Sequence, residues 1–464
     1  MTESAERLLW ARRAWLSGGW QDNVLLRVGT DGCWAEVVPG VSVPPQDAEQ
    51  LPGALLPGLV DAHSPAFQRA FAGLAEQRTS AADTFWSWRD RMYRVALRIT
   101  PEQLRAIAAQ LYIELLQGGY TQVCEFHYLQ HAPDGQPYAD PLAFSWALAD
   151  AARDVGIGLT LLPVLYERAG FRQPALRPDQ RRFATSADSV WHAVQAIRDR
   201  RQPGLDAGLA IHSLRAASPA SVQRLVQLAD GFDGPIHIHV AEQTAEVDDC
   251  LAATGLRPIA WLAAQGLLDE RLQLVHATHT APQEIDAVAR SGAGIVLCPT
   301  TEANLGDGLP DLPGILAQGV PITLGSDSQI TRDWREELRW LDYGQRLIQR
   351  QRNTAAAPEA AQPSTAARLW SCVQAGSAHA AGQPAWGLTP GARADALVLN
   401  PHAAATLGVP PSHLLDALVF SSPSTAWKAV MVAGRWVLQD GQHPQAAQCA
   451  QTFERAMQDL WAEG

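Results

Sequence analysis

The chain has 464 residues, of which 47% are hydrophobic and 18% charged, enough to bury the core of one large domain plus a smaller one and too apolar for a disordered chain. Its net charge of −12 excludes nucleic acid and anionic membrane surfaces as partners, because binding to phosphates needs a basic surface. With no apolar run of about 18 residues and no signal-peptide core at its start, the sequence predicts a cytoplasmic protein.

Residues 1–50 consist of short apolar stretches interrupted by Gly and Pro, which predicts short strands. From residue 54 onward, eight apolar runs are each followed by polar residues and then by helix-like sequence. The eight runs are Ala54–His63, Thr121–Tyr128, Gly158–Tyr166, Gly208–Leu214, Pro235–Glu242, Leu272–His279, Gly294–Thr301 and Pro321–Asp327. Amphipathic stretches typical of helices include Pro101–Leu116, Ser218–Leu228, Pro282–Arg290 and Trp334–Arg350.

Near-continuous apolar strands that alternate with helices indicate a parallel sheet buried on both faces, and eight of them predict a (β/α)8 TIM-like barrel. The last eighty or so residues again read as short strands with turn signals, such as the run at 391–399. Neither end can bury a core alone, so we expect both to form one small β-sandwich. The predicted division is residues 1–52 and 385–464, the latter with a terminal helix, for the sandwich, and 53–384 for the barrel.

Candidate catalytic side chains lie at the ends of the apolar runs, where such barrels keep their active sites. His63 ends the first run, in the string Asp61-Ala62-His63-Ser64-Pro65. The fifth run supplies His239 and Glu242, with His237 about two residues deeper in the barrel. The sixth run ends with His276 and His279, and the eighth with Asp327. An aspartate that ends an apolar strand beside several histidines is typical of a metal ligand or a general base.

The six cysteines are scattered without CxxC spacing, so we interpret them as free thiols and assign them no chemistry.

Several longer strings identify a resemblance to the aminohydrolase branch of the amidohydrolase superfamily, and within it to the formimidoylglutamate deiminase family. The similar strings are Leu55–Gln68 (LLPGLVDAHSPAFQ), Ala66–Ala70 (AFQRA), Gly73–Glu76 (GLAE), Phe85–Arg89 (FWSWR), Glu125–Tyr128 (EFHY), His212–Arg215 (HSLR), His237–Gln243 (HIHVAEQ), His276–His279 (HATH) and Thr301–Gly308 (TEANLGDG). The resemblance covers nearly the full length. It implies hydrolytic deimination of N-formimino-L-glutamate to N-formyl-L-glutamate and ammonia, a step of histidine degradation.

The resemblance also implies one Zn2+ per subunit, held by two first-strand histidines, a fifth-strand histidine and an eighth-strand aspartate. The matching residues are His63, Pro65, His239 and Asp327, so three metal ligands remain because proline has no coordinating atom. The only lysine is Lys428, near the C-terminus. No barrel lysine can therefore form the carbamylated bridge of a two-metal site, which favours a single metal.

In the implied mechanism, zinc-bound water attacks the formimino carbon and Asp327 moves its proton to the departing ammonia. Glu242 would hydrogen-bond the imine nitrogen, and His276 would stabilise the tetrahedral intermediate.

The implied substrate is a small dicarboxylate, which needs fixed cationic donors. The resemblance assigns its binding to Gln68, Tyr128 and Arg215, with Arg89 reaching in from a neighbouring subunit. His212, near its own strand end, joins this substrate-binding set, and His127 is expected behind it. A homodimer follows, with the Trp-rich segment Phe85–Tyr93 as a candidate interface.

Two departures from the family pattern leave three hypotheses open. Pro65 replaces a ligand histidine, and Gln329 stands where the family usually has histidine. The first hypothesis is a working deiminase with three metal ligands, which catalytic zinc permits. The second is a metal-poor pseudoenzyme or binding protein that keeps the glutamate pocket. The third is an aminohydrolase for a cyclic amidine such as a purine or pterin; two arginine clamps count against a neutral ring.

Overall fold

The structure of the chain is a computed structural model, which describes residues 6–77, 84–421 and 426–462. Within these ranges, every helix is too short or too polar to cross a membrane.

Eight parallel strands form a closed barrel, which confirms the predicted fold class. Each strand pairs with the next, and the circle closes where β8 pairs with β10 in parallel. The barrel strands are β6 (Leu59–Asp61), β7 (Tyr120–His127), β8 (Gly158–Leu165), β10 (Leu209–Ser213), β11 (Ile236–Val240), β12 (Leu272–His276), β13 (Gly294–Leu297) and β14 (Ile322–Leu324). A short strand, β9 (Leu205–Ala207), pairs with β8 outside the circle.

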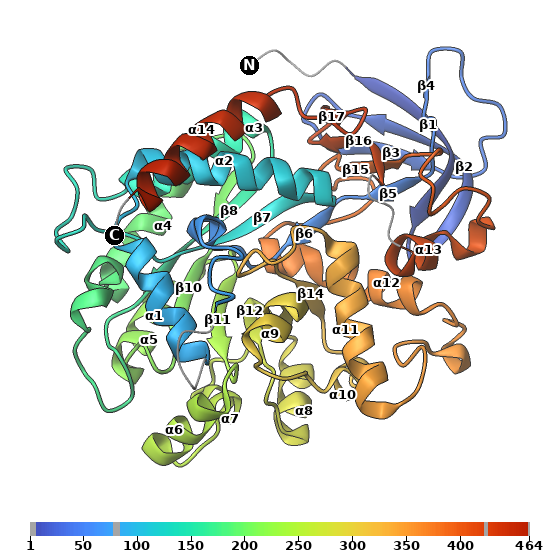
Figure 1. The fold of residues 1–464 in the computed structure, drawn as a ribbon. Coiled ribbons are helices and arrows are strands. Elements are labelled where there is room, and N and C mark those ends of the chain that lie inside the picture. The colour runs from blue at the N-terminus through green and yellow to red at the C-terminus, as the bar shows by residue number, and fades with distance from the viewer. Residues whose placement is uncertain (1–5, 78–83, 422–425, 463–464) are drawn as a thin grey trace.

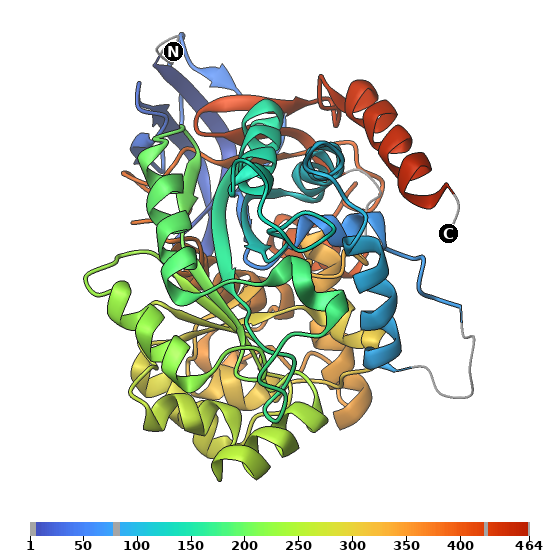
Figure 2. The ribbon, with the colours of Figure 1, turned by 90° about the vertical axis from the view of Figure 1, so that its left-hand side faces the viewer.

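Helices surround the barrel, as Figures 1 and 2 show. The α-helices are α1 (Phe85–Ala96), α2 (Pro101–Gly118), α3 (Ala143–Val155), α4 (Ala187–Asp199), α5 (Pro219–Leu228), α6 (Thr244–Thr254), α7 (Pro258–Ala264), α8 (Pro282–Ser291), α9 (Pro299–Leu305), α10 (Leu312–Ala317), α11 (Trp334–Gln349), α12 (Thr365–Ala381), α13 (Leu414–Phe420) and α14 (Ala446–Trp461). Short 3-10 turns are η1 (Ala66–Ala70), η2 (Pro178–Phe183), η3 (Pro358–Ala360) and η4 (Pro411–His413). The terminal helix α14 lies along α2 (Figure 1).

Helix α2 illustrates how local sequence sets these boundaries. The Thr100 hydroxyl caps its first turn by accepting a hydrogen bond from the Gln103 backbone N–H, and the Gln103 side-chain oxygen accepts one from the Thr100 backbone N–H. Pro101 occupies the first helical position, and Gly119 ends the helix with a φ of 92°, which favours glycine. The predicted helices at Ser218–Leu228, Pro282–Arg290 and Trp334–Arg350 agree with α5, α8 and α11 to within a residue or two.

Both chain ends contribute strands to one mixed sheet beside the barrel, so the expected pairing of the two ends is confirmed (Figure 1). Its strands run in the order β17 (Arg435–Gln439), β16 (Trp427–Val432), β15 (Ala396–Leu399), β5 (Leu55–Pro57), β1 (Arg7–Leu16), β2 (Gly19–Val28) and β3 (Trp34–Val38), with β4 (Glu49–Gln50) pairing with β1. Its buried side chains, such as Leu26 and Met431, form a hydrophobic cluster separate from that of the barrel.

The predicted first barrel run, Ala54–His63, differs from the structure because it is divided between the two sheets. Leu55–Pro57 pairs with β15 of the mixed sheet, whereas Leu59–Asp61 pairs with β7 and β14 of the barrel. Gly58 makes the crossing, and a Cβ at this position would lie 2.2 Å from the Thr121 hydroxyl. The predicted domain division at residues 52/53 and 384/385 stays a prediction.

Candidate active site

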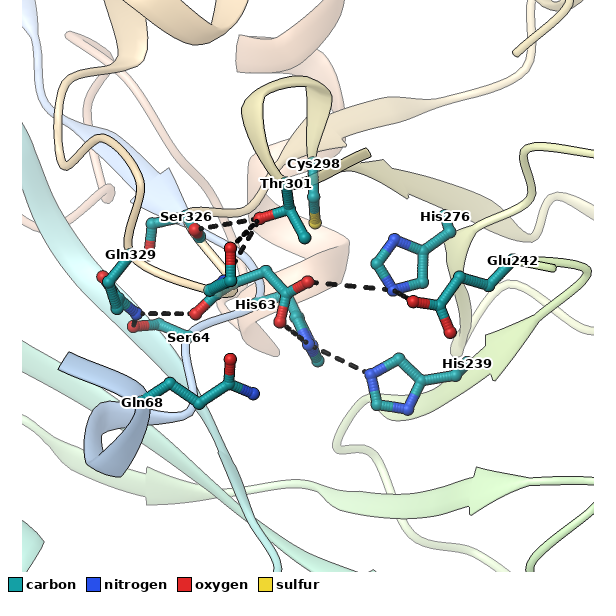
Figure 3. A network of polar contacts seen from close by, with 12 residues as sticks. His63, Ser64, Gln68, His239, Glu242, His276, Cys298, Thr301, Ser326 and Gln329 are labelled. Atoms are coloured by element: carbon teal, nitrogen blue, oxygen red, sulfur yellow. Dashed lines mark hydrogen bonds and ion pairs between the residues drawn. The ribbon is translucent and has the colours of Figure 1, made fainter. Parts of the chain in front are cut away.

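The predicted catalytic side chains converge at the carboxyl ends of the barrel strands, where Figure 3 shows them. His63 follows β6, His239 lies within β11, His276 ends β12, and Asp327 follows β14. The backbone at His276 and Asp327 has φ values of 71° and 41°. Left-handed backbone at residues other than glycine is uncommon and clusters at functional sites, where the surrounding fold enforces it.

Three donor atoms of the predicted metal ligands face one another. His63 Nε2 lies 3.1 Å from His239 Nε2 and 3.3 Å from Asp327 Oδ1. Two ligands bound at about 2.0–2.1 Å to a tetrahedral zinc are about 3.3 Å apart. The distances from His63 Nε2 to each of the other two donor atoms therefore match the spacing of ligands on one zinc ion.

The protonation of the two histidines also suits a metal. Burial lowers the pKa of both His63 and His239, so both imidazoles are neutral. The Nδ1–H of His239 donates to the backbone carbonyl of His212 at 2.8 Å, which leaves the lone pair of His239 Nε2 facing His63. A backbone carbonyl that orients the second ring nitrogen is typical of a metal-binding histidine.

The two departures from the family pattern lie next to each other in the fold. Pro65 is buried and precedes η1, and its carbonyl accepts a hydrogen bond from the Gln68 backbone N–H. The Gln329 amide donates to the Ser64 hydroxyl at 2.9 Å and to the Asp327 carbonyl at 3.0 Å. The Gln329 side chain thus links Ser64, the residue before Pro65, to the backbone of Asp327. Both positions that depart from the family pattern therefore lie at the same place in the site.

A cluster of acids surrounds His276. Its Nε2 lies 3.6 Å from Glu242 Oε1 and 3.9 Å from Asp327 Oδ2, and its Nδ1 lies 3.4 Å from Glu302 Oε1. Burial alone would lower the pKa of His276, but the three carboxylates outweigh it and raise that pKa. Burial raises the pKa of Glu242 despite the nearby imidazolium. The pKa of Asp327 falls, although burial opposes the shift, because His63 donates a hydrogen bond to it and the His276 imidazolium attracts its charge.

A proton donor and a proton acceptor therefore lie side by side here. The His276 imidazolium can stabilise negative charge, Glu242 can hold a proton near neutral pH, and the Asp327 carboxylate can accept one.

Sequence reasoning missed two contributors to this cluster. Glu302 contacts His276 from α9, just after the seventh strand, and Ser326 donates from its hydroxyl to the buried Asp61 carboxylate at 2.6 Å. The signal for Glu302 was its position after a barrel strand; nothing in the sequence marked the pairing of residues 61 and 326. His237 and His279 turn away from the site, to the carbonyls of Ala380 and Asp307.

The predicted substrate-binding residues line the same end of the barrel. The Gln68 amide N–H donates to the Tyr128 hydroxyl at 3.3 Å, while Gln68 Oε1 is buried without a partner. The ring of His212 contacts those of Tyr128 and His239, with centroids 5.6 and 5.0 Å apart. His212 therefore connects the metal donors to the wall formed by Gln68 and Tyr128. His127 is buried, and burial lowers its pKa to about 3.

Two arginines stack on one tryptophan beside this wall. The guanidinium carbons of Arg89 and Arg215 lie 4.5 and 5.3 Å from the ring centre of Trp86. Arg89 thus lies beside Arg215 within one chain, and its predicted entry into the site of a neighbouring subunit stays a prediction. Arg215 is only 9% exposed, and in the described ranges its guanidinium makes no ion pair or hydrogen bond. A buried cation with unused donors is typical of a site for an anionic ligand.

Comparisons with known proteins agree with this geometry. Residues 54–437 match the model of the Amidohydrolase family. Formimidoylglutamate deiminase from Pseudomonas aeruginosa is 46% identical over 97% of this chain and 99% of its own length. An amidohydrolase crystal structure from Brucella melitensis is 38% identical, with a TM-score of 0.92 over 98% of this chain and 99% of its own. An adenosine deaminase from Xanthomonas campestris with bound zinc shares the fold at 22% identity, with a TM-score of 0.81 over 98% of both chains.

Proposed function

The chain belongs to the amidohydrolase family, and on that premise we propose that it hydrolyses N-formimino-L-glutamate to N-formyl-L-glutamate and ammonia. The observation that carries this proposal is the 46% identity to formimidoylglutamate deiminase over almost the full length of both chains. The buried guanidinium of Arg215 supports it independently, because in the described ranges it makes no ion pair or hydrogen bond and its N–H donors can therefore bind a substrate carboxylate.

We assign the metal to His63, His239 and Asp327, as one zinc ion per subunit. When bound, zinc supplies a water whose pKa is lowered toward about 7. Neutral imidazoles and an ionised carboxylate are the donor forms that binding requires.

Three side chains would move or hold protons during the reaction. The Asp327 carboxylate takes a proton from the attacking water as the new C–O bond forms, and later passes it to the nitrogen that leaves as ammonia. Glu242, which can keep a proton near neutral pH, hydrogen-bonds the imine nitrogen. The His276 imidazolium donates toward the oxygen of the tetrahedral intermediate and stabilises its charge.

The glutamate part would bind on the side of Arg215. A guanidinium matches a carboxylate with two parallel N–H donors, and Arg89, which stacks on the same Trp86 ring as Arg215, would serve the second carboxylate. Gln68, Tyr128 and His212 would close the space between these arginines and the metal. A neutral cyclic amidine offers nothing to the two guanidinium groups, so the geometry favours the linear dicarboxylate.

We also propose a homodimer, with the segment Phe85–Tyr93 at its interface. The aromatic rings of Trp86 and Trp88 in this segment are only partly buried within one chain. The cytoplasmic location remains a prediction from the sequence.

The test measures metal content and ammonia release together, on purified protein supplied with zinc and N-formimino-L-glutamate. Stoichiometric zinc with turnover supports the deiminase, and zinc-loaded protein without turnover contradicts it. Pro65 favours one alternative, a metal-poor binding protein that keeps the dicarboxylate pocket. That alternative predicts substrate binding without hydrolysis in the native chain, and hydrolysis after Pro65→His.

A further inference from the structure

A buried thiol lies at the site without a role in the proposed chemistry. Cys298 directly follows β13 and is fully buried. Its backbone N–H donates to Glu302 Oε1 at 3.1 Å, but in the described ranges its sulfur makes no hydrogen bond. The coordinating capacity of this sulfur is therefore unused by the protein itself.

The thiol belongs to a group of metal-binding atom types. Cys298 Sγ, a ring nitrogen of His276 and a carboxylate oxygen of Asp327 all lie within 4.8 Å of one another. Figure 3 shows the sulfur turned toward the polar network rather than away from it. The thiol thus lies next to Asp327, which we assign as a metal ligand.

The thiol also lies close to His63, and Gly325 lies between the two side chains. A Cβ built on Gly325 would lie 2.7 Å from His63 Cβ and 2.9 Å from Cys298 Sγ. Only glycine, which has no side chain, leaves room at position 325 for both the His63 side chain and the Cys298 thiol. His63 and Cys298 therefore approach one glycine just after the eighth strand, two residues before Asp327.

Of the residues at the two departures, Pro65 cannot replace the missing ligand. Pro65 has no side-chain donor, and its carbonyl is hydrogen-bonded to the Gln68 N–H. The Gln329 amide N–H donates to Ser64 and to the Asp327 carbonyl, and Gln329 Oε1 is buried without a hydrogen-bond partner, but an amide oxygen is not among the preferred ligands of zinc. A thiolate, in contrast, is among the preferred ligands of zinc, at about 2.3 Å.

We propose that Cys298 Sγ is the fourth protein ligand of the metal, with His63, His239 and Asp327, in place of the histidine absent at position 65. Ligand atoms around zinc are about 3.3–3.6 Å apart, and Cys298 Sγ lies within 4.8 Å of an Asp327 carboxylate oxygen, so binding requires these two atoms to approach by up to about 1.5 Å. The thiol releases its proton to solvent when it binds the metal. The inference rests on the metal site of the proposed function and is independent of its substrate.

The first test uses cobalt, which reports directly on sulfur ligation. Native protein loaded with Co2+ is expected to show a thiolate-to-cobalt charge-transfer band in the near ultraviolet. Cys298→Ser should abolish that band. The matched control is Cys250→Ser, which alters another fully buried thiol in α6, away from the site, and should leave the band unchanged. Failure of the native protein to bind cobalt, absence of the band, or its persistence in Cys298→Ser overturns the proposal.

The second test compares zinc affinity in two backgrounds, by competition with a chelating indicator. In the native background, Cys298→Ser should weaken zinc binding by roughly 100-fold, since even the loss of an outer partner costs about 10- to 100-fold. In the Pro65→His background the same change should cost less than about 3-fold, because the histidine supplies the ligand. Equal losses in both backgrounds, or none in the native one, contradict the proposal.

Neither readout depends on turnover or on one variant. If Cys298→Ser does not fold, the cobalt spectrum of the native chain and the affinity of Cys298→Ala decide. A sulfur–cobalt band in a protein that releases no ammonia would refute the proposed substrate and leave the ligand assignment standing. Turnover without the band would refute the ligand assignment and leave the proposed substrate standing.

Discussion

Replacing Arg215 by methionine removes a buried guanidinium from the substrate side of the barrel and keeps most of the side-chain length. Arg215 is 9% exposed and stacks 5.3 Å from the Trp86 ring centre, where methionine can still fill the space. The change therefore isolates the loss of the charge and of its paired N–H donors. We expect Arg215→Met to fold and to retain its metal, because the assigned metal ligands lie elsewhere.

The expected loss follows from the bonds that the guanidinium can make. Two charge-assisted hydrogen bonds to one carboxylate contribute about 1.5–3 kcal/mol each. Because about 1.4 kcal/mol corresponds to a factor of ten, the two bonds together imply a fall in kcat/KM of about 100- to 10,000-fold. Arg89 shares the Trp86 ring and can partly replace the lost charge, so we expect a value near the lower end.

Steady-state ammonia release measures this loss, and two control measurements show whether it reflects the binding of a carboxylate. Arg224→Met, which breaks an exposed ion pair with Asp188, should change kcat/KM less than about twofold. An N-formimino amine without carboxylates should be hydrolysed poorly and equally by native protein and Arg215→Met. If Arg215→Met impairs both substrates to the same degree, Arg215 does not bind a carboxylate and the reasoning fails.

Three further predictions concern the metal and the buried acids. In the Cys298→Ser background, Pro65→His should raise zinc affinity at least about 10-fold, since the φ of −79° and ψ of 98° at position 65 suit histidine without strain; unchanged affinity in equilibrium dialysis would refute the missing-ligand interpretation. Chelation should abolish turnover and lower the unfolding temperature, and added zinc should restore both; a chelated protein that keeps full turnover would contradict the metal assignment. Burial raises the pKa of Glu125 from 4.5 to about 8, so between these pH values the folded state holds a proton that the unfolded state releases. The contribution of this proton to the free energy of unfolding is complete below pH 4.5 and is lost as pH rises toward 8. Glu125→Gln should remove that part of the decline in unfolding free energy between about pH 5 and 8, and an unaltered pH profile in denaturant titrations would show that Glu125 is already ionised.

The sequence predicts the barrel well because each buried strand is a continuous apolar run. It also predicts His63, His276 and Asp327 at the site, because each lies at or near the end of such a run and parallel strands end at one edge. The contact of Gln329 with Ser64 could not be predicted, since it depends on barrel closure between residues 265 positions apart in sequence. The same reason conceals the approach of Cys298 to His63 across Gly325.

The first strand shows a different limit of sequence reasoning. An apolar run has the same pattern whether its two halves pair in one sheet or in two, so Ala54–His63 reads as one strand. Only the pairing partners, β15 for Leu55–Pro57 and β7 with β14 for Leu59–Asp61, reveal the division.

That division couples the two ends of the chain to the metal site. Gly58 joins the two sheets, and its carbonyl accepts hydrogen bonds from the Trp386 indole and the Gln374 amide, at 2.9 and 3.0 Å. His63 lies only five residues further along. Loss of the C-terminal strands would therefore release the segment that carries the first metal ligand, and heat should melt barrel and mixed sheet in a single calorimetric transition rather than one after the other.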